Sequence, residues 1–200
     1  MEEFSDRVAL VTGSTSGIGE ATAKRLVALG AKVMLNSSTS ISDGERLASE
    51  LEGASYHQGD ISSEDDCKNL VNATIEAFGR LDILVNNAGF TSVIPHADLD
   101  GVTEEVFRRI IDVNIFGTWY LSRAVVPALK ESGSGNIVNI SSIAGLRPVG
   151  SSIPYSISKA GVNQMTRLMA NVLGPEIRVN AVAPGLVETP WTESWDTLHA

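Results

Sequence analysis

The chain of 200 residues is 43% hydrophobic and 20% charged, which excludes extended disorder and provides enough apolar side chains for the core of one domain. Its formal net charge of −9 disfavours nucleic acid and anionic membrane surfaces as partners. No apolar run approaches the roughly 20 residues that span a bilayer, so no membrane partner is expected.

Short apolar runs alternate with longer helical patterns along the whole chain. Strands are predicted at residues 8–11, 32–35, 54–58, 83–85, 136–140 and 178–183. Helices are predicted at residues 18–29, 43–51, 65–78, 103–130 and 155–173. Apolar strands separated by helices are typical of a parallel sheet covered on both faces. We therefore expect an α/β fold with a doubly wound parallel sheet (Rossmann fold), forming one domain over residues 1–200.

A glycine-rich turn, Thr12-Gly13-Ser14-Thr15-Ser16-Gly17-Ile18-Gly19, joins the first predicted strand to the first predicted helix. Glycine lets the backbone turn tightly beside a pyrophosphate, and a helix N-terminus presents free N–H groups to the anion. A purely structural loop is the alternative. The place of the turn between a strand and a helix favours phosphate binding, and its spacing is G-x-x-x-G-x-G.

Two polar segments follow predicted strands, at the edge of the sheet where ligands are expected. Asp60 comes after the third strand, where a carboxylate accepts from an adenine amino group or caps the next helix; its position leaves both interpretations open. Asn86-Asn87-Ala88-Gly89 ends the fourth strand. Its small residues allow a nucleotide to approach, although Asn and Gly also form simple turns.

Tyr155 and Lys159 form a candidate acid/base pair, four residues apart at the start of a predicted helix and therefore on one face of it. A phenol with a pKa of about 10 exchanges protons poorly at neutral pH, and a nearby lysine cation lowers that pKa. Ser142 ends the fifth predicted strand, where its hydroxyl binds a substrate oxygen or caps a turn. Asn114 lies inside a predicted helix, which indicates a bound water or a local kink unless the amide faces solvent.

Cysteine and histidine offer little further chemistry. Cys67 is the only cysteine, which excludes an internal disulfide and favours a reducing cytoplasm; with no histidine near it in the sequence, we expect a spectator thiol. His57, His96 and His199 form no ligand cluster, so no metal is expected. The first residues lack the basic-then-apolar pattern of a signal peptide, which also favours a cytoplasmic protein.

Taken in order, these motifs resemble those of the short-chain dehydrogenase/reductase family. The matching residues are Thr12-Gly13-x-x-x-Gly17-Ile18-Gly19, Asp60, Asn86-Asn87-Ala88-Gly89, Asn114, Ser142, Tyr155-x-x-x-Lys159 and Pro184-Gly185-x-x-x-Thr189. The resemblance implies an NAD(P)(H)-dependent oxidoreductase, a short-chain alcohol dehydrogenase or carbonyl reductase that interconverts a ketone or aldehyde and an alcohol by hydride transfer. It also implies a homodimer or homotetramer.

The resemblance assigns roles to particular side chains. Tyr155 is implied to be the general acid/base, and Lys159 to bind the nicotinamide ribose and lower the tyrosine pKa. Ser142 is implied to polarise the substrate carbonyl, and Asn114 to keep a water in the proton relay. The other implied cofactor-binding residues are Gly13, Ser16, Gly17, Ile18 and Gly19 at the pyrophosphate, Asn36 and Ser37 near the adenosine ribose, Asp60 and Ile61 at the adenine, Asn87, Ala88 and Gly89 at the adjacent ribose region, and Pro184, Gly185, Val187 and Thr189 near the nicotinamide.

The end of the second predicted strand bears on the choice between NAD and NADP. In this fold an acidic side chain there bonds the ribose 2′-hydroxyl and repels a 2′-phosphate. The chain has Asn36-Ser37-Ser38-Thr39 instead, and it has Ser16 where many NADP-preferring relatives carry an arginine. Because several donors and no acid are present, we expect NADP(H) to be favoured over NAD(H).

The expected substrate is a small, apolar carbonyl compound or alcohol, such as an acyl, cyclic or aromatic ketone. Its expected walls are Ile94, Leu146, Val149, Ile153, Leu186 and residues 191–195, in which Trp191 and Trp195 either cover the substrate or serve packing alone. Residues 186–200 are expected to begin the substrate lid. Because the family continues beyond Ala200 with a helix and a seventh strand, we expect its C-terminal strand to be absent from this sheet.

A non-catalytic NAD(P)-binding sensor or scaffold on the same fold is the alternative function. Such a protein is expected to lose Tyr155 or Lys159 while keeping the glycine turn, whereas this chain has both, together with Ser142 and Asn114. An extended-type epimerase or dehydratase is disfavoured, because its glycine spacing and its larger substrate domain are absent.

Overall fold

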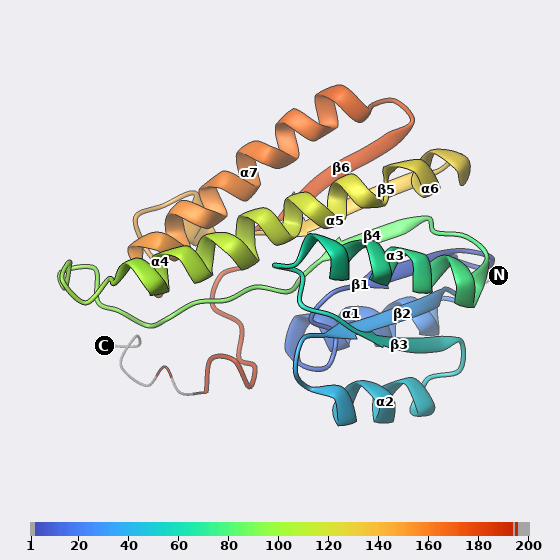
Figure 1. Cartoon of the computed structure of the whole chain (residues 1–200), viewed down its shortest axis with the longest axis horizontal. Helices are drawn as coiled ribbons and strands as arrows, with labels where there is room; N and C mark the ends of the chain where they lie inside the picture. Colours follow the sequence, from blue (N-terminus) through green and yellow to red (C-terminus); the bar gives the residue numbers. More distant parts are fainter. Residues whose placement is uncertain (1–2, 194, 196–200) are drawn as a thin grey trace.

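Six parallel strands form one sheet in the computed structural model, which describes residues 3–193 and 195 (Figure 1). The strands are β1 (Val8–Val11), β2 (Lys32–Ser37), β3 (Ala54–Gln58), β4 (Ile83–Asn86), β5 (Gly135–Ile140) and β6 (Ile177–Val182). Their order is β3-β2-β1-β4-β5-β6, so the direction of winding reverses between β1 and β4. All six predicted strands and the doubly wound parallel fold are confirmed.

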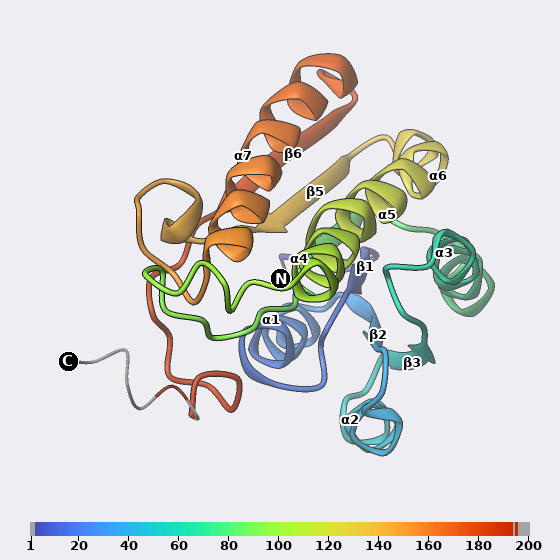
Figure 2. The ribbon, with the colours of Figure 1, turned by 60° about the vertical axis from the view of Figure 1, so that its left-hand side comes forward.

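Helices lie on both sides of this sheet (Figure 2). They are α1 (Gly17–Ala28), α2 (Ile41–Glu50), α3 (Glu64–Phe78), α4 (Glu104–Ile111), α5 (Thr118–Ala124), α6 (Val126–Glu131) and α7 (Ile153–Leu173). The ends of α1, α2, α3 and α7 agree with the sequence prediction to within two residues. Among the described residues no helix combines the length and the apolarity needed to cross a bilayer.

Strand β1 shows how the alternation of side chains builds a core on each face of the sheet. Val8 and Leu10 join a cluster with α3, α5, α6 and α7, while Ala9 and Val11 join a second cluster with α1 and α2. All four side chains are almost fully buried. Burying each large aliphatic side chain contributes about 1.5–3 kcal/mol, so the apolar strands predicted from the sequence are also the main source of stability.

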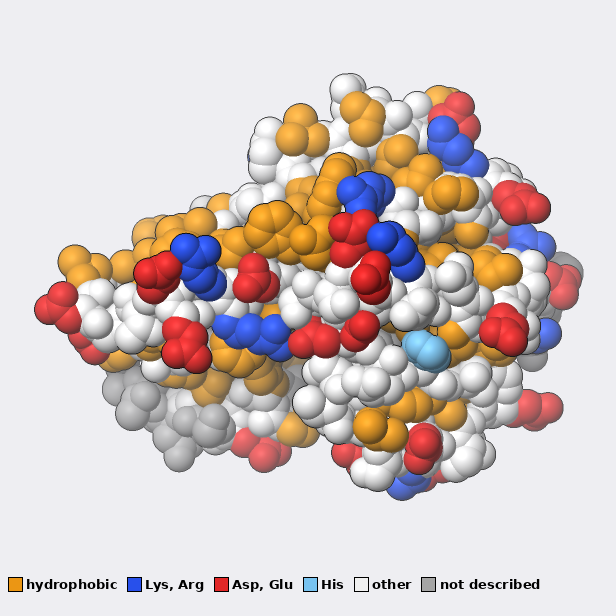
Figure 3. Space-filling model, in the orientation of Figure 1, with side chains coloured by type: hydrophobic (Ala, Val, Ile, Leu, Met, Phe, Trp, Pro, Cys, Tyr) orange, Lys and Arg blue, Asp and Glu red, His pale blue; other side chains and the backbone are white. Residues whose placement is uncertain are grey.

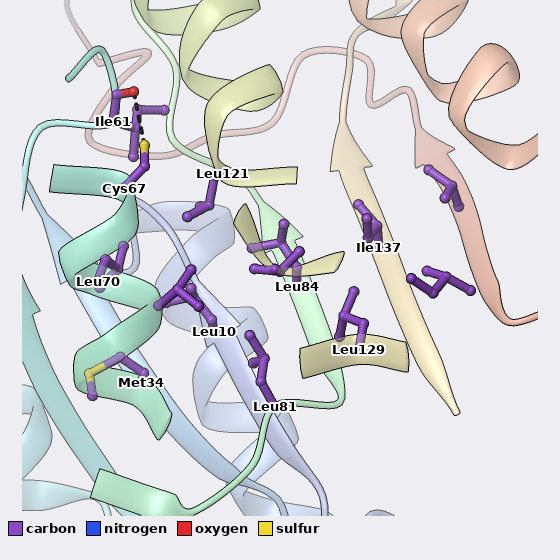
Figure 4. Packing of buried hydrophobic residues seen from close by; sticks show 14 of the residues in the cluster. Leu10, Met34, Ile61, Cys67, Leu70, Leu81, Leu84, Leu121, Leu129 and Ile137 are labelled. Atoms are coloured by element: carbon purple, nitrogen blue, oxygen red, sulfur yellow. Dashed lines mark hydrogen bonds between the residues drawn. The ribbon is translucent and has the colours of Figure 1, made fainter. Parts of the chain in front are cut away.

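Cys67 lies on α3 within the first of these clusters, beside Ile61 and Leu70 (Figure 4). Its thiol donates to the backbone carbonyl of Ile61 at 3.2 Å. Burial raises the pKa of the Cys67 thiol to about 12, so the thiol stays protonated at neutral pH. These surroundings agree with the prediction of a spectator thiol.

The prediction of one continuous helix over residues 103–130 is wrong. A π-helical segment, η1 (Asp112–Gly117), separates α4 from α5. The helix is interrupted a second time between α5 and α6. Pro127 begins α6, where its missing N–H leaves no helical hydrogen bond unmade. Asn114 lies inside η1, so the local distortion that this residue indicated is present.

The surface over the helices carries mixed charges and an apolar area. Acidic and basic side chains alternate across the view in Figure 3, while hydrophobic side chains gather along the upper helices. Exposed apolar residues on η1, α5 and α7 include Phe116, Trp119, Leu168 and Val172. In the part of the chain that the structure describes, no three His, Cys, Asp or Glu side chains are placed to hold a metal ion.

Asp82 fixes the amino end of β4, away from the ligand-binding edge of the sheet. Its fully buried carboxylate accepts from the Val8 N–H at 2.9 Å and pairs with Arg7 at 3.0 Å and Arg80 at 2.6 Å. Burial favours a higher pKa for Asp82, but the hydrogen bonds from Arg80, Val8 and Arg7 outweigh it and hold the pKa below its usual value.

We expect Asp82→Asn to lower the free energy of unfolding by about 2 kcal/mol, because charge-assisted hydrogen bonds are lost in a buried place. Since the pKa of Asp82 is lowered in the folded state, this contribution is present above the unfolded pKa and disappears as the pH falls through the folded pKa. Urea unfolding at neutral and acidic pH measures both effects. The control is Asp65→Asn on α3, whose side chain is 88% exposed beside Lys68 and which is expected to cost less than about 0.5 kcal/mol. Equal losses for the two variants would contradict the assignment.

Candidate active site

A cavity of about 1000 Å³ runs along the carboxyl ends of the strands, where the strand order reverses. Every predicted catalytic or cofactor-binding residue except Gly19 and Asn114 lines it. These lining residues are Gly13, Ser16, Gly17, Ile18, Asn36, Ser37, Asp60, Ile61, Asn87, Ala88, Gly89, Ser142, Tyr155, Lys159, Pro184, Gly185, Val187 and Thr189. The fold therefore brings together groups that are up to 176 positions apart (189 − 13) in the sequence.

The glycine turn has the backbone geometry that phosphate binding requires. Gly13 and Gly17 have positive φ angles of 58° and 54°, which side-chain-bearing residues rarely adopt. A Cβ on Gly19 would lie 2.3 Å from the Gly13 carbonyl oxygen, so Gly19 supports the turn from behind instead of lining the cavity. No side chain caps the N-terminus of α1 at Ser16, which leaves its first N–H groups for an anion.

Two polar side chains attach this turn to the end of β4. The Asn87 amide donates to the carbonyl oxygens of Thr12 at 2.9 Å and Gly13 at 3.0 Å. The Thr12 hydroxyl accepts from the N–H groups of Asn87 and Ala88, both at 3.0 Å. The Asn87 side chain thus holds the glycine turn in place, a role that its position after β4 did not indicate.

Asp60 does not cap α3, so that alternative for it is wrong, while the adenine-binding alternative stays a prediction. Ser63 caps α3, while Asp60 accepts from the N–H and hydroxyl of Ser62 and pairs with Arg109 at 3.0 Å. Burial favours a higher pKa for Asp60, but the bonds from Ser62 and Arg109 outweigh it and lower the pKa. The carboxylate is therefore ionised and faces the cavity. Arg109 also lines the cavity. Its place on a surface helix does not distinguish it in the sequence as a cavity residue.

At the end of β2, the predicted ribose-binding side chains are turned toward internal partners. The Asn36 amide donates to the carbonyls of His57 and Gly59, and the Ser37 hydroxyl lies 2.8 Å from the Tyr56 hydroxyl. Both residues are buried. The exposed cavity residues at this end are instead Ser38 and Thr39. The sequence pattern included both in the segment Asn36-Ser37-Ser38-Thr39 but did not indicate which of its side chains face the cavity.

Tyr155, Ser142 and Lys159 meet at the other end of the cavity. Tyr155 is 6% exposed, and its hydroxyl lies near Ser142. Burial raises the pKa of the Tyr155 phenol, and the nearby Ser142 side chain only partly offsets this. The Lys159 ammonium donates to the Ile140 carbonyl at 2.8 Å and lies 5.6 Å from the centre of the Tyr155 ring. Burial lowers the pKa of Lys159 to about 8.

The net pKa shift of Tyr155 is upward, opposite to the lowering that the resemblance implies for Lys159. The two shifts have one cause, since burial disfavours both the phenolate and the ammonium. The Ser142 hydroxyl accepts from the Ala144 N–H at 3.1 Å and caps the short helix η2 (Ile143–Gly145), so the turn-capping alternative is confirmed, while binding of a substrate oxygen stays a prediction.

Asn114 lies behind this group and is fully occupied by the protein. Its carbonyl oxygen accepts from the Phe90 N–H at 2.8 Å, and its amide donates to the Phe90 carbonyl and the Ser158 hydroxyl. Ser158 in turn donates to the Tyr155 carbonyl at 2.7 Å. The Asn114 side chain therefore joins the π-helical segment to the start of α7, and a water in a proton relay needs another partner, such as the backbone.

Apolar residues form the cavity wall beside Tyr155. Of the expected wall residues, Ile94, Val149, Leu186, Trp191 and Trp195 line the cavity. Leu146 and Ile153 do not, and those two predictions are wrong: Leu146 is 61% exposed after η2, and Ile153 lies in the first turn of α7. The sequence also missed wall residues Val93, Pro95 and His96. Part of the expected lid over residues 186–200 lies outside the described residues, namely residue 194 and residues 196–200, which include His199.

Known proteins are similar to this chain in both sequence and fold. The family described as short chain dehydrogenase matches residues 7–199. The protein named "granaticin polyketide synthase putative ketoacyl reductase 2" from Streptomyces violaceoruber is 56% identical over 94% of this chain and 76% of its own length. A 3-oxoacyl-(acyl-carrier-protein) reductase from Thermotoga maritima is 38% identical over 94% of this chain and 76% of its own length. The crystal structure of a 3-ketoacyl-(acyl-carrier-protein) reductase from Brucella melitensis complexed with NADH superposes with a TM-score of 0.88 at 38% identity, covering 94% of this chain and 78% of that one.

The chain belongs to the short-chain dehydrogenase/reductase family and is an oxidoreductase of that family. Its relatives support NAD(P)-dependent oxidoreduction. The residues present fit such a cofactor, because Gly13, Gly17 and the open N-terminus of α1 form a cradle for a pyrophosphate in a cavity large enough for a dinucleotide.

Proposed function

We propose that this oxidoreductase interconverts a small apolar ketone or aldehyde and the corresponding alcohol, with Tyr155 as the general acid/base and NADP(H) favoured over NAD(H). The observation that carries the proposal is the placement of the buried Tyr155, with Ser142 and Lys159, in the same cavity as the glycine turn. Its apolar wall suits an uncharged substrate. The proposal makes the enzyme a carbonyl reductase or alcohol dehydrogenase.

Ser142, Tyr155 and Lys159 have different roles in the proposed carbonyl reduction. A bound nicotinamide supplies or accepts the hydride. Ser142 donates a hydrogen bond to the substrate oxygen and holds it beside Tyr155. Because the pKa of Tyr155 is raised, the phenol is protonated at neutral pH and gives its proton to that oxygen, leaving a phenolate. The Lys159 ammonium stabilises the phenolate through space and binds ribose hydroxyls, and alcohol oxidation reverses the proton transfer.

The proposed cofactor contacts follow the cavity from end to end. Gly13, Ser16, Gly17, Ile18 and Gly19 surround the pyrophosphate, with Gly19 acting from behind the turn. Asp60 and Ile61 bind the adenine, and Asn87, Ala88 and Gly89 lie at the adjacent ribose. Pro184, Gly185, Val187 and Thr189 lie near the nicotinamide. Ser38 and Thr39, rather than the buried Asn36 and Ser37 side chains, face a 2′-phosphate.

A non-catalytic NAD(P)-binding sensor or scaffold remains the alternative. The placement of Tyr155, Ser142 and Lys159 together in one cavity argues against it, because cofactor binding alone does not require a buried phenol beside a serine and a lysine. We also propose a homodimer or homotetramer, supported by the exposed apolar residues Phe116, Trp119, Leu168 and Val172, and a cytoplasmic location, for which the single buried cysteine is the support.

We expect Tyr155→Phe to lower kcat for ketone reduction by about 100-fold or more, because the phenol hydroxyl is the proton donor. NADPH binding should persist, since the ring remains in place. A spectrophotometric screen of NADPH and NADH oxidation over several ketone classes measures turnover, and fluorescence titration measures cofactor binding. Wild-type turnover in the variant would overturn the mechanism, and cofactor binding by the wild-type protein without turnover of any ketone would favour the sensor.

We expect kcat/KM for NADPH in ketone reduction to fall as the pH rises through about 8, because Lys159 loses its charge there while Tyr155 stays protonated. Rates measured from about pH 6 to 10 at constant ionic strength test this expectation. Lys159→Arg keeps the charge at high pH and should move the fall to a higher pH, whatever its absolute rate. A profile that is flat across this range would contradict the role of Lys159.

We expect Ser38→Asp to raise the Kd for NADPH by about tenfold, because a carboxylate at the end of β2 repels a 2′-phosphate. The Kd for NADH should change by less than about threefold. Ser38→Asn is the matched control, because asparagine has the size of aspartate but no charge. It should leave both Kd values near those of the wild-type protein. Fluorescence titration with each cofactor measures them, and a parallel change for NADPH and NADH would refute the assignment of this segment.

A further inference from the structure

Trp191 brings an aromatic side chain to the catalytic tyrosine. The centres of the Trp191 and Tyr155 rings are 6.2 Å apart, and their planes meet at 68°, an edge-to-face contact. Trp195 lies 5.6 Å from Trp191 on its other side, tilted by 56°. Neither neighbour stacks parallel to the indole, and Trp191 is 45% exposed although it lines the cavity. Indole surface is therefore available to a ligand.

The segment that carries Trp191 is held by hydrogen bonds within residues 187–192 and by a contact of Thr189 with the glycine turn. The Thr192 hydroxyl accepts from the Thr189 N–H at 3.1 Å and lies 2.9 Å from the Val187 carbonyl oxygen. Thr189 packs against the phosphate turn, because a Cβ on Gly17 would lie 3.3 Å from its side chain. Trp191 is thus held in a defined place between the cofactor turn and Tyr155, as a specificity-determining residue must be.

Among the apolar wall residues, Ile94, Val149 and Leu186 are aliphatic and accept a chain or a ring alike.

A planar ring gains additional energy from another π-system, in an offset or edge-to-face arrangement. Phe90, His96 and Trp195 also line the cavity, but Trp191 is the wall residue whose ring contacts the ring of Tyr155. The indole of Trp191 is next to Tyr155, and the substrate carbonyl must reach the Tyr155 hydroxyl. The ring that benefits is therefore one fused or bonded directly to the carbonyl carbon.

We propose that Trp191 determines substrate specificity by binding the planar ring of a cyclic aromatic ketone against its indole. The inference rests on the proposed carbonyl reduction and narrows its substrate class from apolar carbonyl compounds to aryl ketones with a rigid ring system. Open-chain aliphatic ketones still enter the cavity and meet the same tyrosine, but they gain only aliphatic contacts.

The test compares α-tetralone, a fused aryl ketone, with 2-octanone, an open-chain ketone, in the full chain. In Trp191→Leu, which keeps an apolar side chain, kcat/KM for α-tetralone should fall by about tenfold, and that for 2-octanone by less than about threefold. Trp191→Phe keeps an aromatic face and should retain α-tetralone activity to within about threefold. Equal losses for both ketones, or no loss for α-tetralone, would overturn the proposal.

A binding measurement separates this inference from the proposed function. Saturation-transfer NMR gives the Kd of α-tetralone for the Tyr155→Phe protein with NADP⁺ present, in which the proposed proton donor has been removed. Adding Trp191→Leu should raise that Kd by about tenfold, and adding Trp191→Phe should not. If the wild-type protein reduces neither ketone, the proposed function fails, while this Kd still decides the role of Trp191. An unchanged Kd in the Trp191→Leu background refutes it.

Discussion

The hydrogen bonds between Thr12, Gly13 and Asn87 determine where everything else in the cavity can lie. They join the turn after β1 to the end of β4, the two strands between which the sheet changes its direction of winding. Parallel pairing of these strands brings their carboxyl ends level. The side-chain bonds then fix the turn against Ala88, and Gly19 closes it from behind at a distance that no side chain allows. The glycine turn is thereby attached to the segment that follows β4.

Burial acts on the catalytic pair in a consistent direction. It raises the pKa of Tyr155 and lowers that of Lys159, so it favours the uncharged form of both groups. The Lys159 ammonium donates to the Ile140 carbonyl, and Ser142 lies beside the Tyr155 hydroxyl. At neutral pH the phenol is therefore protonated, while Lys159, with a pKa of about 8, still carries a charge. In this structure burial, rather than the lysine charge, sets the direction of the Tyr155 pKa shift.

The six strands, and the placement of Tyr155 and Lys159 on one helix, could be predicted from the sequence because their signals are local. A run such as Val8–Val11 has one stable placement, in a sheet buried on both faces, and Tyr155 and Lys159 share a helix face by spacing alone. Side-chain direction was not predictable in the same way. Asn36 and Ser37 turn inward because His57 and Tyr56 on the neighbouring strand offer partners, a fact of strand pairing. Arg109 and the π-helical break around Asn114 depend likewise on contacts with Asp60 and Phe90 across the fold.

The exposed position of Ser38 and Thr39 at the end of β2 has a consequence for how such a protein can diversify. The hydrogen bonds at the centre of the cavity join Thr12, Gly13 and Asn87, and neither Ser38 nor the wall residue Trp191 takes part in them. Substitutions at Ser38 and at Trp191 therefore leave these hydrogen bonds in place. The two ends of the cavity can accordingly change independently of each other, while the hydrogen bonds between them stay the same.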